Sequence, residues 1–375
     1  MIERDKHKKR QGRPPRERTK LVKRIRGRIL EGQYGPGDRL PTRREIKRTS
    51  GTSLVTVQRA LSDLKKQGFL SARPGDGTYV VERPPHLYRY GFLLPASPDG
   101  PGNHFFKALR AEALHFEKQS KREMVFYEGV SGPVLSDAYE KLLSDVRSHR
   151  LAGLISLSYP AYLGGTPILK EPDLPRVAIG QGEPRSNASV VRIDQNEFLK
   201  RSLKYLQEKG REKIAVVLVL AFSRSMEPDA WRAQLEPLLQ ERGMTTKTSW
   251  IQAVDCYSEH WAANTSRLLG EMVDRSGPDG LVIADDNVVE PVTRGLVEAE
   301  VKIPEELEIV AHCNFPWPTP SAAPVKRIGF DLHRVLECCF ELIDRQRQEG
   351  KTPGMLEVPP VLEENATKKG DLRQL

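Results

Sequence analysis

The chain has 375 residues and a net charge of +9, and it is long enough to hold two or three domains with substantial cores. Its positive charge is concentrated at one end. Residues 1–85 carry 23 Lys and Arg against 9 Asp and Glu, whereas the remainder carries 36 against 41. This asymmetry indicates that a nucleic-acid partner meets the basic segment. No apolar run approaches the roughly 20 residues that cross a bilayer, and the N-terminus does not resemble a signal sequence, so we expect a cytoplasmic protein without a membrane partner.

Residues 1–20 form a basic, low-complexity segment that we expect to be disordered. Within it, residues 11–16 resemble a degenerate AT-hook, a Gly-Arg-Pro core with flanking cations that fits a narrow minor groove. The alternative is a solvated leader that only adds nonspecific affinity for phosphate. We favour the leader, because short basic motifs recur by chance.

Residues 21–82 predict a winged helix-turn-helix domain. Apolar residues from Leu21 to Ile29 are spaced as in an amphipathic helix, and a short second helix is predicted to begin within residues 41–46. Gly51 is a plausible end for the second helix, and Thr52 or Ser53 is a suitable N-cap for a third. Residues 69–73 and 78–81 read as two strands of a hairpin, or wing, around a Gly-rich tip.

The third helix has the pattern expected of a helix that reads DNA. Its apolar residues are spaced by three, four and seven, so they gather on one side and face a small core. Val55, Gln58 and Arg59 then point outward, which presents an apolar group, an amide and a cation to the bases and phosphates. In the wing, Gly75 and Gly77 would let backbone approach a phosphate, and Arg73 lies at the base.

The order of these motifs resembles the GntR family of bacterial winged-helix regulators. The resemblance covers roughly the first fifth of the chain and rests on residues 36–41, 44–46, 56–61, 68–70 and 75–80. It implies DNA-contact positions at Arg44, Ser53, Thr56, Gln58 and Gly75. The family often has arginine at the positions of Leu54 and Gln58, so the operator sequence does not follow from the family. The residues expected to contact DNA are Arg43, Arg44, Ser53, Val55, Thr56, Gln58, Arg59, Arg73, Gly75 and Gly77.

Residues 83–88 contain two consecutive prolines and predict an extended linker. From residue 89 to 375, apolar strand candidates alternate with helical stretches. That alternation is typical of an α/β architecture with buried parallel strands, and the length suits two lobes. The last 25 residues give no clear pattern beyond a possible short strand at 358–362.

Motifs in this second part resemble the effector domains of LacI-type regulators, which look like periplasmic sugar-binding proteins. The matching segments are residues 90–95, 153–155, 191–194, 213–216, 279–286 and 303–310. The resemblance implies two Rossmann-like lobes with crossovers near residues 192, 221 and 313 and an effector in the cleft. It also implies a homodimer that pairs through this body.

Ligand contacts are expected where strands end at a crevice. Asp286 matches the family's cleft aspartate, and its alternative role is to cap the following helix. Trp317 suits stacking on a sugar ring, or equally packing at a hinge, and the family's usual aspartate is replaced by Cys313, which puts an ordinary sugar in doubt. The residues expected to bind the ligand are Phe105, Phe106, Arg224, Trp231, Arg232, Asp286, Asn314 and Trp317.

We find no metal-binding spacing, no nucleophile elbow and no phosphate loop, so we expect neither an enzyme nor a cofactor. Cys256, Cys313, Cys338 and Cys339 read as core thiols. The function expected from the sequence is a transcription regulator, most simply a repressor, that binds an operator as a dimer and responds to a carbohydrate-like effector. The alternative is a constitutive DNA-binding or architectural protein whose α/β body only dimerises.

Overall fold

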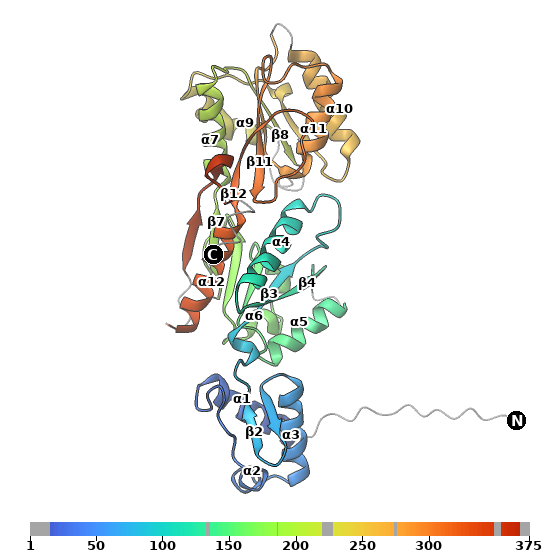
Figure 1. Ribbon diagram of the computed structural model, residues 1–375. Coiled ribbons are helices and arrows are strands. Elements are labelled where there is room, and N and C mark those ends of the chain that lie inside the picture. The colour runs from blue at the N-terminus through green and yellow to red at the C-terminus, as the bar shows by residue number, and fades with distance from the viewer. Residues whose placement is uncertain are drawn as a thin grey trace, which may run out of the picture. The chain divides into compact units, whose positions relative to one another are not determined.

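The computed structural model describes residues 16–132, 136–185, 187–219, 228–273, 276–348 and 354–367. The chain forms two compact units (Figure 1). The first contains residues 1–89 and 144–152, and the second contains residues 90–143 and 153–375. We call residues 16–82 the head and the second unit the body, and describe each by itself. No helix of the described residues is long and apolar enough to span a membrane.

The head consists of three helices and a two-stranded wing. Its elements are α1 (Arg16–Leu30), α2 (Arg43–Ser50), α3 (Leu54–Lys66), β1 (Leu70–Arg73) and β2 (Gly77–Val80). The wing strands pair antiparallel, with Leu70 opposite Val80 and Arg73 opposite Gly77. The segment before α2 adds to the wing, because the Leu40 N–H donates to the Thr78 carbonyl (2.8 Å).

One apolar cluster holds the head together. Val57, Ala60, Leu61 and Leu64 of α3 are buried, as their spacing predicts. They pack with the apolar face of α1 and with Ile46, Phe69 and Val80. Helix α1 begins at Arg16, so it starts within the segment expected to be disordered, and Arg18 pairs with Asp63 of α3. The possible AT-hook at residues 11–16 lies almost wholly outside the described residues.

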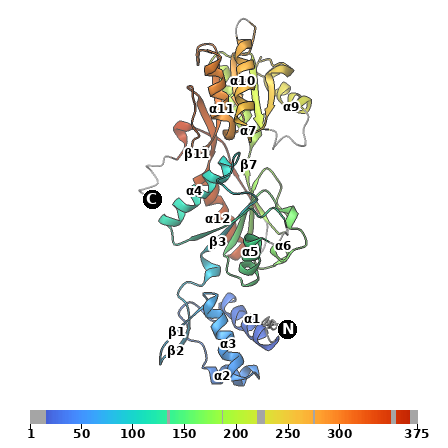
Figure 2. The same cartoon turned by 90° about the vertical axis from the view of Figure 1, so that its right-hand side faces the viewer.

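The body contains two six-stranded sheets, each of which forms the centre of a lobe (Figures 1 and 2). The first sheet has the order β13-β7-β6-β5-β3-β4 and the second has the order β14-β12-β11-β10-β8-β9. The strands of the first sheet are β3 (Arg89–Leu94), β4 (Glu123–Glu128), β5 (Gly153–Leu157), β6 (Arg176–Gly180), β7 (Ser189–Ile193) and β13 (Met355–Val358). Those of the second are β8 (Ile214–Val219), β9 (Ile251–Val254), β10 (Gly280–Ile283), β11 (Glu308–Phe315), β12 (Lys326–Asp331) and β14 (Val361–Leu362).

The main helices of the body alternate with these strands. They are α4 (His104–Gln119), α5 (Asp137–Arg147), α6 (Pro167–Lys170), α7 (Gln195–Glu208), α9 (Pro228–Gln240), α10 (Glu259–Val273), α11 (Val289–Glu298) and α12 (Leu332–Gln348). From β8 to β12, neighbouring strands of the second sheet are parallel, and β14 is antiparallel to β12. The predicted architecture of parallel sheets in two lobes is therefore confirmed.

The chain crosses between the lobes three times. The first crossing follows β7 at Ile193, as predicted near residue 192. The crossings predicted near residues 221 and 313 are wrong, because β8 and β9 share the second sheet, and so do β11 and β12. The second crossing instead runs from Asp331 into α12, and the third lies between β13 and β14. The order of motifs predicted the elements, but it did not show which sheet each strand joins.

Two strands were not predicted. β12 starts with two cations, Lys326 and Arg327, which are half-buried and hide its strand pattern. β13 is mostly exposed, yet it pairs parallel with β7 from Met355 opposite Val190 to Val358 opposite Ile193. Its amphipathic strand pattern is too short to identify without knowledge of the partner strand.

Candidate DNA-binding and effector sites

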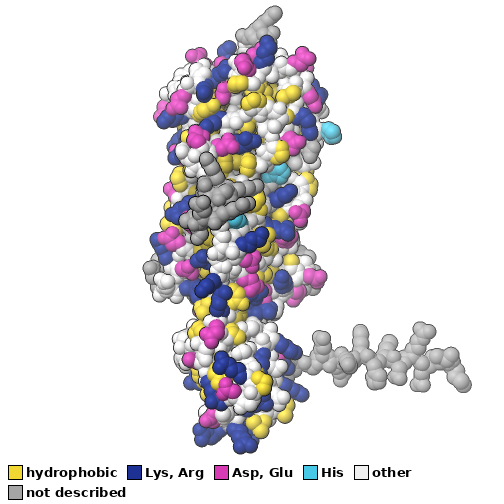
Figure 3. Space-filling view, viewed as in Figure 1, with side chains coloured by type: hydrophobic (Ala, Val, Ile, Leu, Met, Phe, Trp, Pro, Cys, Tyr) yellow, Lys and Arg dark blue, Asp and Glu magenta, His cyan; other side chains and the backbone are white. Residues whose placement is uncertain are grey.

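Helix α2 presents cations at the surface of the head. A capping box fixes its first turn: the Thr42 hydroxyl accepts the Glu45 N–H, and the Glu45 carboxylate accepts the Thr42 N–H (2.7 Å). Gly51 ends the helix with φ 68°, which glycine adopts without strain. Arg43 and Arg44 in the first turn are exposed, and Figure 3 shows Lys and Arg side chains gathered over the end of the head where α2 lies.

Helix α3 buries one face and exposes the other. The structure places Val55, Gln58 and Arg59 at the surface, and the Val55 side chain is 57% exposed. Ser53 and Thr56 are engaged with each other, because the Ser53 hydroxyl accepts the Thr56 N–H (3.1 Å) and lies 2.9 Å from the Thr56 hydroxyl. The Ser53 side chain therefore caps the helix, and a DNA contact to the Ser53 or Thr56 hydroxyl would compete with the hydrogen bond between them.

The wing contains a cation that the sequence did not indicate. The Arg39 guanidinium hydrogen-bonds the carbonyl of Asp76 and lies 3.9 Å from its carboxylate. A Cβ at Gly77 would approach the Arg39 Nε to 2.9 Å, so the glycine leaves room for this side chain. Gly75 has φ +76° and open space around it. Arg73 stacks on the Tyr79 ring, with its guanidinium carbon 4.3 Å from the ring centre.

In the body, polar side chains meet at the carboxyl ends of β10 and β11, which are parallel neighbours. Asp286 follows β10 and is 3% exposed, and Asn314 near the end of β11 is 1% exposed. The Asn314 Nδ2 donates to the Asp286 carboxylate (2.7 Å), while the buried Asn314 Oδ1 has no hydrogen-bond partner. We call Asp285, Asp286 and Asn314 the acceptor cluster.

Asp285 connects this cluster to the first lobe. Its carboxylate accepts the backbone N–H (2.9 Å) and the side-chain amide (2.7 Å) of Asn287, which starts the turn after β10. The Asn287 side-chain oxygen accepts the N–H of His104, the first residue of α4 (2.9 Å). Phe105 and Phe106 lie in the same turn of α4 and are half-buried. The structure thus brings the start of α4 into contact with Asn287, which in turn contacts Asp285.

The two carboxylates of the cluster are electrostatically unusual. Burial, followed by repulsion from Asp286, raises the pKa of Asp285, and burial raises the pKa of Asp286. Burial also lowers the pKa of His104, which keeps this histidine neutral near neutral pH. The neighbouring thiols of Cys256 and Cys313 have pKa values raised by burial. His104, the basic group that acts on Asp285, therefore offers little compensating positive charge near neutral pH.

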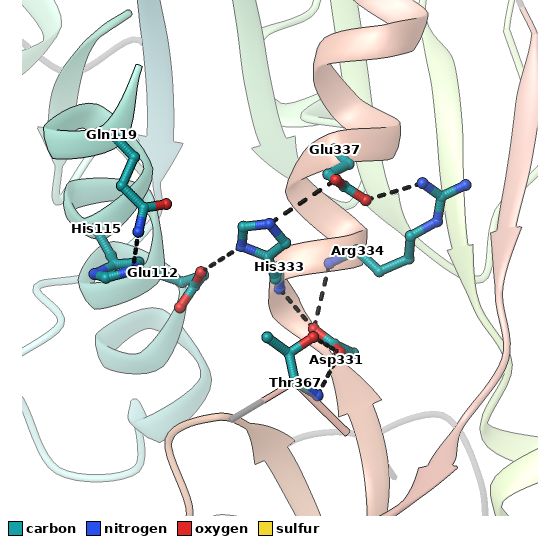
Figure 4. Close-up of polar contacts among 8 residues, drawn as sticks. All are labelled: Glu112, His115, Gln119, Asp331, His333, Arg334, Glu337 and Thr367. Carbon is teal, nitrogen blue, oxygen red and sulfur yellow. Dashed lines mark hydrogen bonds and ion pairs between the residues drawn. The ribbon is translucent and has the colours of Figure 1, made fainter. Parts of the chain in front are cut away.

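Trp317 is fixed by a glutamate that the sequence did not single out. The indole N–H of Trp317 donates to Glu112 of α4 (2.9 Å), a side chain with no exposed surface. His333 of α12 contacts the other oxygen of Glu112 (2.9 Å), as Figure 4 shows, and its ring stacks on Phe116. The hydrogen bond to Glu112 raises the pKa of His333. Trp317 thus packs between the lobes, which was one of its two predicted roles.

The remaining predicted ligand residues are Arg224, Trp231 and Arg232. Arg224 lies outside the described residues. Trp231 lies on α9, and only its backbone is described. Arg232 hydrogen-bonds Glu236 of α9 (2.6 Å) and the Thr248 hydroxyl (2.8 Å) rather than any residue of the acceptor cluster. Among the described residues, no group of three or more Asp, Glu, His or Cys is arranged to hold a metal ion.

Two aspartates cap the helices that follow the first two crossings. Asp194 accepts the backbone N–H of Asn196 (2.8 Å) at the start of α7, so it caps this helix. Asp331 accepts the N–H of His333 (3.0 Å) at the start of α12, and its other oxygen accepts the N–H of Thr367 (3.0 Å) (Figure 4). The places where the chain changes lobe are therefore ordered by charged caps.

Comparisons with known proteins agree with this division of the chain. Residues 18–80 match the gntR family of bacterial regulatory proteins, and residues 203–363 match a periplasmic binding protein-like domain. The mannosyl-D-glycerate transport/metabolism system repressor MngR of Escherichia coli is 44% identical over 62 residues, which are 16% of this chain and 26% of that protein. The Uxu operon regulator of Haemophilus influenzae is 33% identical over 96 residues, 26% of this chain and 34% of that protein. The chain spans between 13% and 46% of the length of the curated relatives that it matches.

Solved structures resemble the body. A LacI family transcriptional regulator from Arthrobacter sp. FB24, in complex with lactose, has a TM-score of 0.55 at 16% identity, covering 75% of this chain and 99% of that one. Another from Lactobacillus casei, with bound glucose, has a TM-score of 0.53 at 15% identity, covering 73% and 97%. The chain therefore joins a gntR-family helix-turn-helix domain to a body with the periplasmic binding protein-like fold of LacI-type regulators.

Proposed function

We propose that this protein is a transcription regulator, acting in the cytoplasm, whose head binds operator DNA and whose body binds a small carbohydrate-like effector. The observation that carries the proposal is the outward face of α3, where Val55, Gln58 and Arg59 are exposed beside the cationic first turn of α2. A helix with this face can lie in the major groove, while Arg43, Arg44 and Arg73 contact phosphates or base edges.

The acceptor cluster supports the effector-binding part of the proposal. Buried carboxylate and amide oxygens at the carboxyl ends of parallel strands are suited to accept hydrogen bonds from a polar ligand. Asn314 Oδ1 in particular is buried and unpartnered, and leaving it so is costly. Two of the structural neighbours were solved with glucose and lactose, which makes carbohydrates the first class to test.

A homodimer through the body is supported by an exposed apolar face. Trp261, Leu268 and Met272 lie on one side of α10, and the Leu268 side chain is 59% exposed. Val297 of the adjacent α11 is also exposed, and Figure 2 shows these two helices side by side. Pairing this face with a second copy would bury it and would give two heads for a pseudo-palindromic operator.

The mechanism we propose is a shift between two arrangements of the body. An effector that binds one arrangement more tightly favours it, and the DNA affinity of the dimer changes by that difference in binding free energy. We expect the effector to release the protein from its operator, which makes it a repressor. The alternative, an architectural protein whose body only dimerises, would bind DNA equally well with and without a ligand.

The test is a selection of DNA fragments bound by the full chain, with and without glucose, lactose and related sugars. Recovery of one fragment family whose binding changes with a ligand supports the regulator. A preferred sequence whose binding no ligand alters favours the architectural alternative. Recovery of no preferred sequence under any condition would remove the proposed function altogether.

A further inference from the structure

The acceptor cluster is made of hydrogen-bond acceptors, and the amide donors of Asn287 and Asn314 beside it are already used. The buried Nδ1 of His104, which faces Asp285 from α4, has no hydrogen-bond partner. Asn314 Nδ2 is bonded to Asp286, and both N–H groups of Asn287 that face Asp285 are bonded to it. Turning the Asn314 amide over would place its oxygen 2.7 Å from a carboxylate oxygen, so the assigned orientation is the favourable one. Asn314 Oδ1 therefore remains a buried acceptor without a donor, next to two acids.

No Lys or Arg of the described residues forms an ion pair with Asp285 or Asp286. His104 faces Asp285 from α4, and its burial favours the neutral form. The other facing groups are the thiols of Cys256 and Cys313 and the amide of Asn287. The charge of Arg327 favours a lower pKa for the Cys313 thiol, but this guanidinium is paired with the carboxylate of Glu363.

Asp286 is buried and Asp285 is half-buried, and two neighbouring carboxylates of this kind are costly to ionise where no described cation pairs with them. A neutral sugar hydroxyl can donate one hydrogen bond to them and brings no compensating charge. An ammonium group donates three hydrogen bonds and also supplies the charge. One ammonium group shared by Asp285, Asp286 and Asn314 would give each acceptor a hydrogen bond and would also bring a positive charge to the two carboxylates.

We propose that the effector carries an ammonium group that binds between Asp285, Asp286 and Asn314, as in an amino sugar, rather than being a neutral sugar. The inference rests on the proposed function, because it assigns the ligand class of the same site. It also fits the presence of Cys313 beside the pair. A third carboxylate there would add further repulsion to the pair, whereas the buried thiol stays uncharged.

The proposal is tested by calorimetric titration of the full chain with matched pairs, D-glucosamine against D-glucose and D-galactosamine against D-galactose. At about pH 6.5, the measurement is repeated in two buffers that differ in ionisation enthalpy, which gives the number of protons exchanged on binding. We expect at least one amino sugar to bind about ten-fold or more tightly than its neutral partner. Binding should release protons, because a bound cation favours the ionised form of the aspartates.

Asp286→Asn is expected to remove most of this preference and to reduce the proton release, whereas Glu305→Gln, an exposed acid of the same lobe, should change neither. Circular dichroism establishes that each variant is folded. The proposal is overturned if neither amino sugar binds, if a neutral sugar binds as tightly as its amino partner, or if binding takes up protons. A preference that survives in Asp286→Asn overturns it as well.

A parallel measurement of operator binding separates this inference from the proposed function. If a neutral sugar alters operator affinity and the amino sugars do not, regulation stands and the cationic ligand class is wrong. If the chain has no preferred DNA sequence but binds an amino sugar with proton release, the proposed function fails and the assignment of the site remains.

Discussion

Glu112 of the first lobe accepts a hydrogen bond from the indole of Trp317 in the second lobe, at 2.9 Å and without exposure to solvent. Its other oxygen contacts His333, which begins α12 just after the chain has crossed back to the first lobe (Figure 4). The buried carboxylate of Glu112 thus contacts Trp317 of the other lobe and His333 in the helix that follows a crossing. Any change in the angle between the lobes has to keep this contact or break it.

The charge of Glu112 should control the protonation of His333. Glu112→Gln preserves an acceptor for Trp317 but removes the negative charge, so we expect the pKa of His333 to fall. A raised histidine pKa stabilises the fold at low pH, and this contribution is lost as pH rises through the raised value. The stability difference between wild type and variant should therefore be larger at pH 6 than at pH 8. NMR titration of the His333 ring and urea unfolding measure the two effects.

Glu337→Gln is the matched control, because Glu337 also faces His333, at 3.9 Å, but is 44% exposed. Solvent screens this pair, so its removal should lower the pKa of His333 less than Glu112→Gln does. Equal shifts in the two variants would show that the buried hydrogen bond does not set the protonation of His333.

The acid pair should make the body less stable as pH rises. Native Asp285 and Asp286 have raised pKa values, so the folded chain holds more protons than the unfolded chain between the ordinary range of about 4 and the raised values. Their contribution is therefore present at low pH and is lost through weakly acidic to neutral pH. We expect the double variant Asp285→Asn, Asp286→Asn to lose stability less steeply from pH 5 to 8 in thermal unfolding. Asp99→Asn, at an exposed ion pair, serves as control, and identical slopes in all three proteins would contradict the prediction.

The cap of α3 should contribute measurably to the stability of the head. Ser53→Ala removes the acceptor of the Thr56 N–H and should cost about 1 kcal/mol of unfolding free energy. Ser53→Asn retains a capping side chain and should recover most of that loss. Chemical denaturation followed by circular dichroism would test this, and a neutral Ser53→Ala would mean that the hydroxyl is not needed as a cap.

Arg44 should matter for DNA but not for folding. It is exposed on α2, whereas Ile46 of the same helix is buried in the core of the head. Arg44→Ala is expected to weaken binding to a selected operator by about ten-fold with little change in melting temperature. Lys20→Ala, which removes an exposed cation of α1, should have a smaller effect in the same fluorescence-anisotropy assay. An unchanged operator affinity would exclude Arg44 from the contact surface.

The apolar face of α10 should determine the oligomeric state. Leu268→Glu places a charge at an exposed position, so the fold should tolerate it while association of two bodies should not. We expect sedimentation velocity to show a dimer for wild type and a monomer for the variant. Tyr162→Glu, at a partly exposed aromatic of the first lobe, is the control, and a dimeric Leu268→Glu would place the interface elsewhere.

Much of the fold is predictable because periodicity is a local property. Ser53 and Gly51 mark helix ends by their own backbone preferences, and the apolar positions of α3 follow directly from its turn angle. The partner of a strand is not local. β13 can be recognised as a strand only from its pairing with β7, and more than half of the body lies between the two in the sequence. Without such pairings, the positions where the chain crosses between the lobes could not be predicted.

The candidate sites show the same limit. Asp286 and Asn314 were predicted to lie together because both were expected at strand ends, and strand ends meet at one edge of a parallel sheet. Glu112 was not found, because a single glutamate in an amphipathic helix is normally solvated, and only Trp317 and His333 make it a buried acceptor. Arg39 was missed for a similar reason, since its place beside Gly77 depends on how the wing folds back.

The position of β13 has a consequence for how the molecule is made. The strand pairs with β7, although residues 194–331 of the second lobe lie between them in the chain. On the ribosome, the lobe that is synthesised first must therefore wait for the lobe synthesised second before its own sheet is complete. A first lobe excised before residue 355 would lack β13, and a nascent chain stopped at the same point would leave β7 as an open edge.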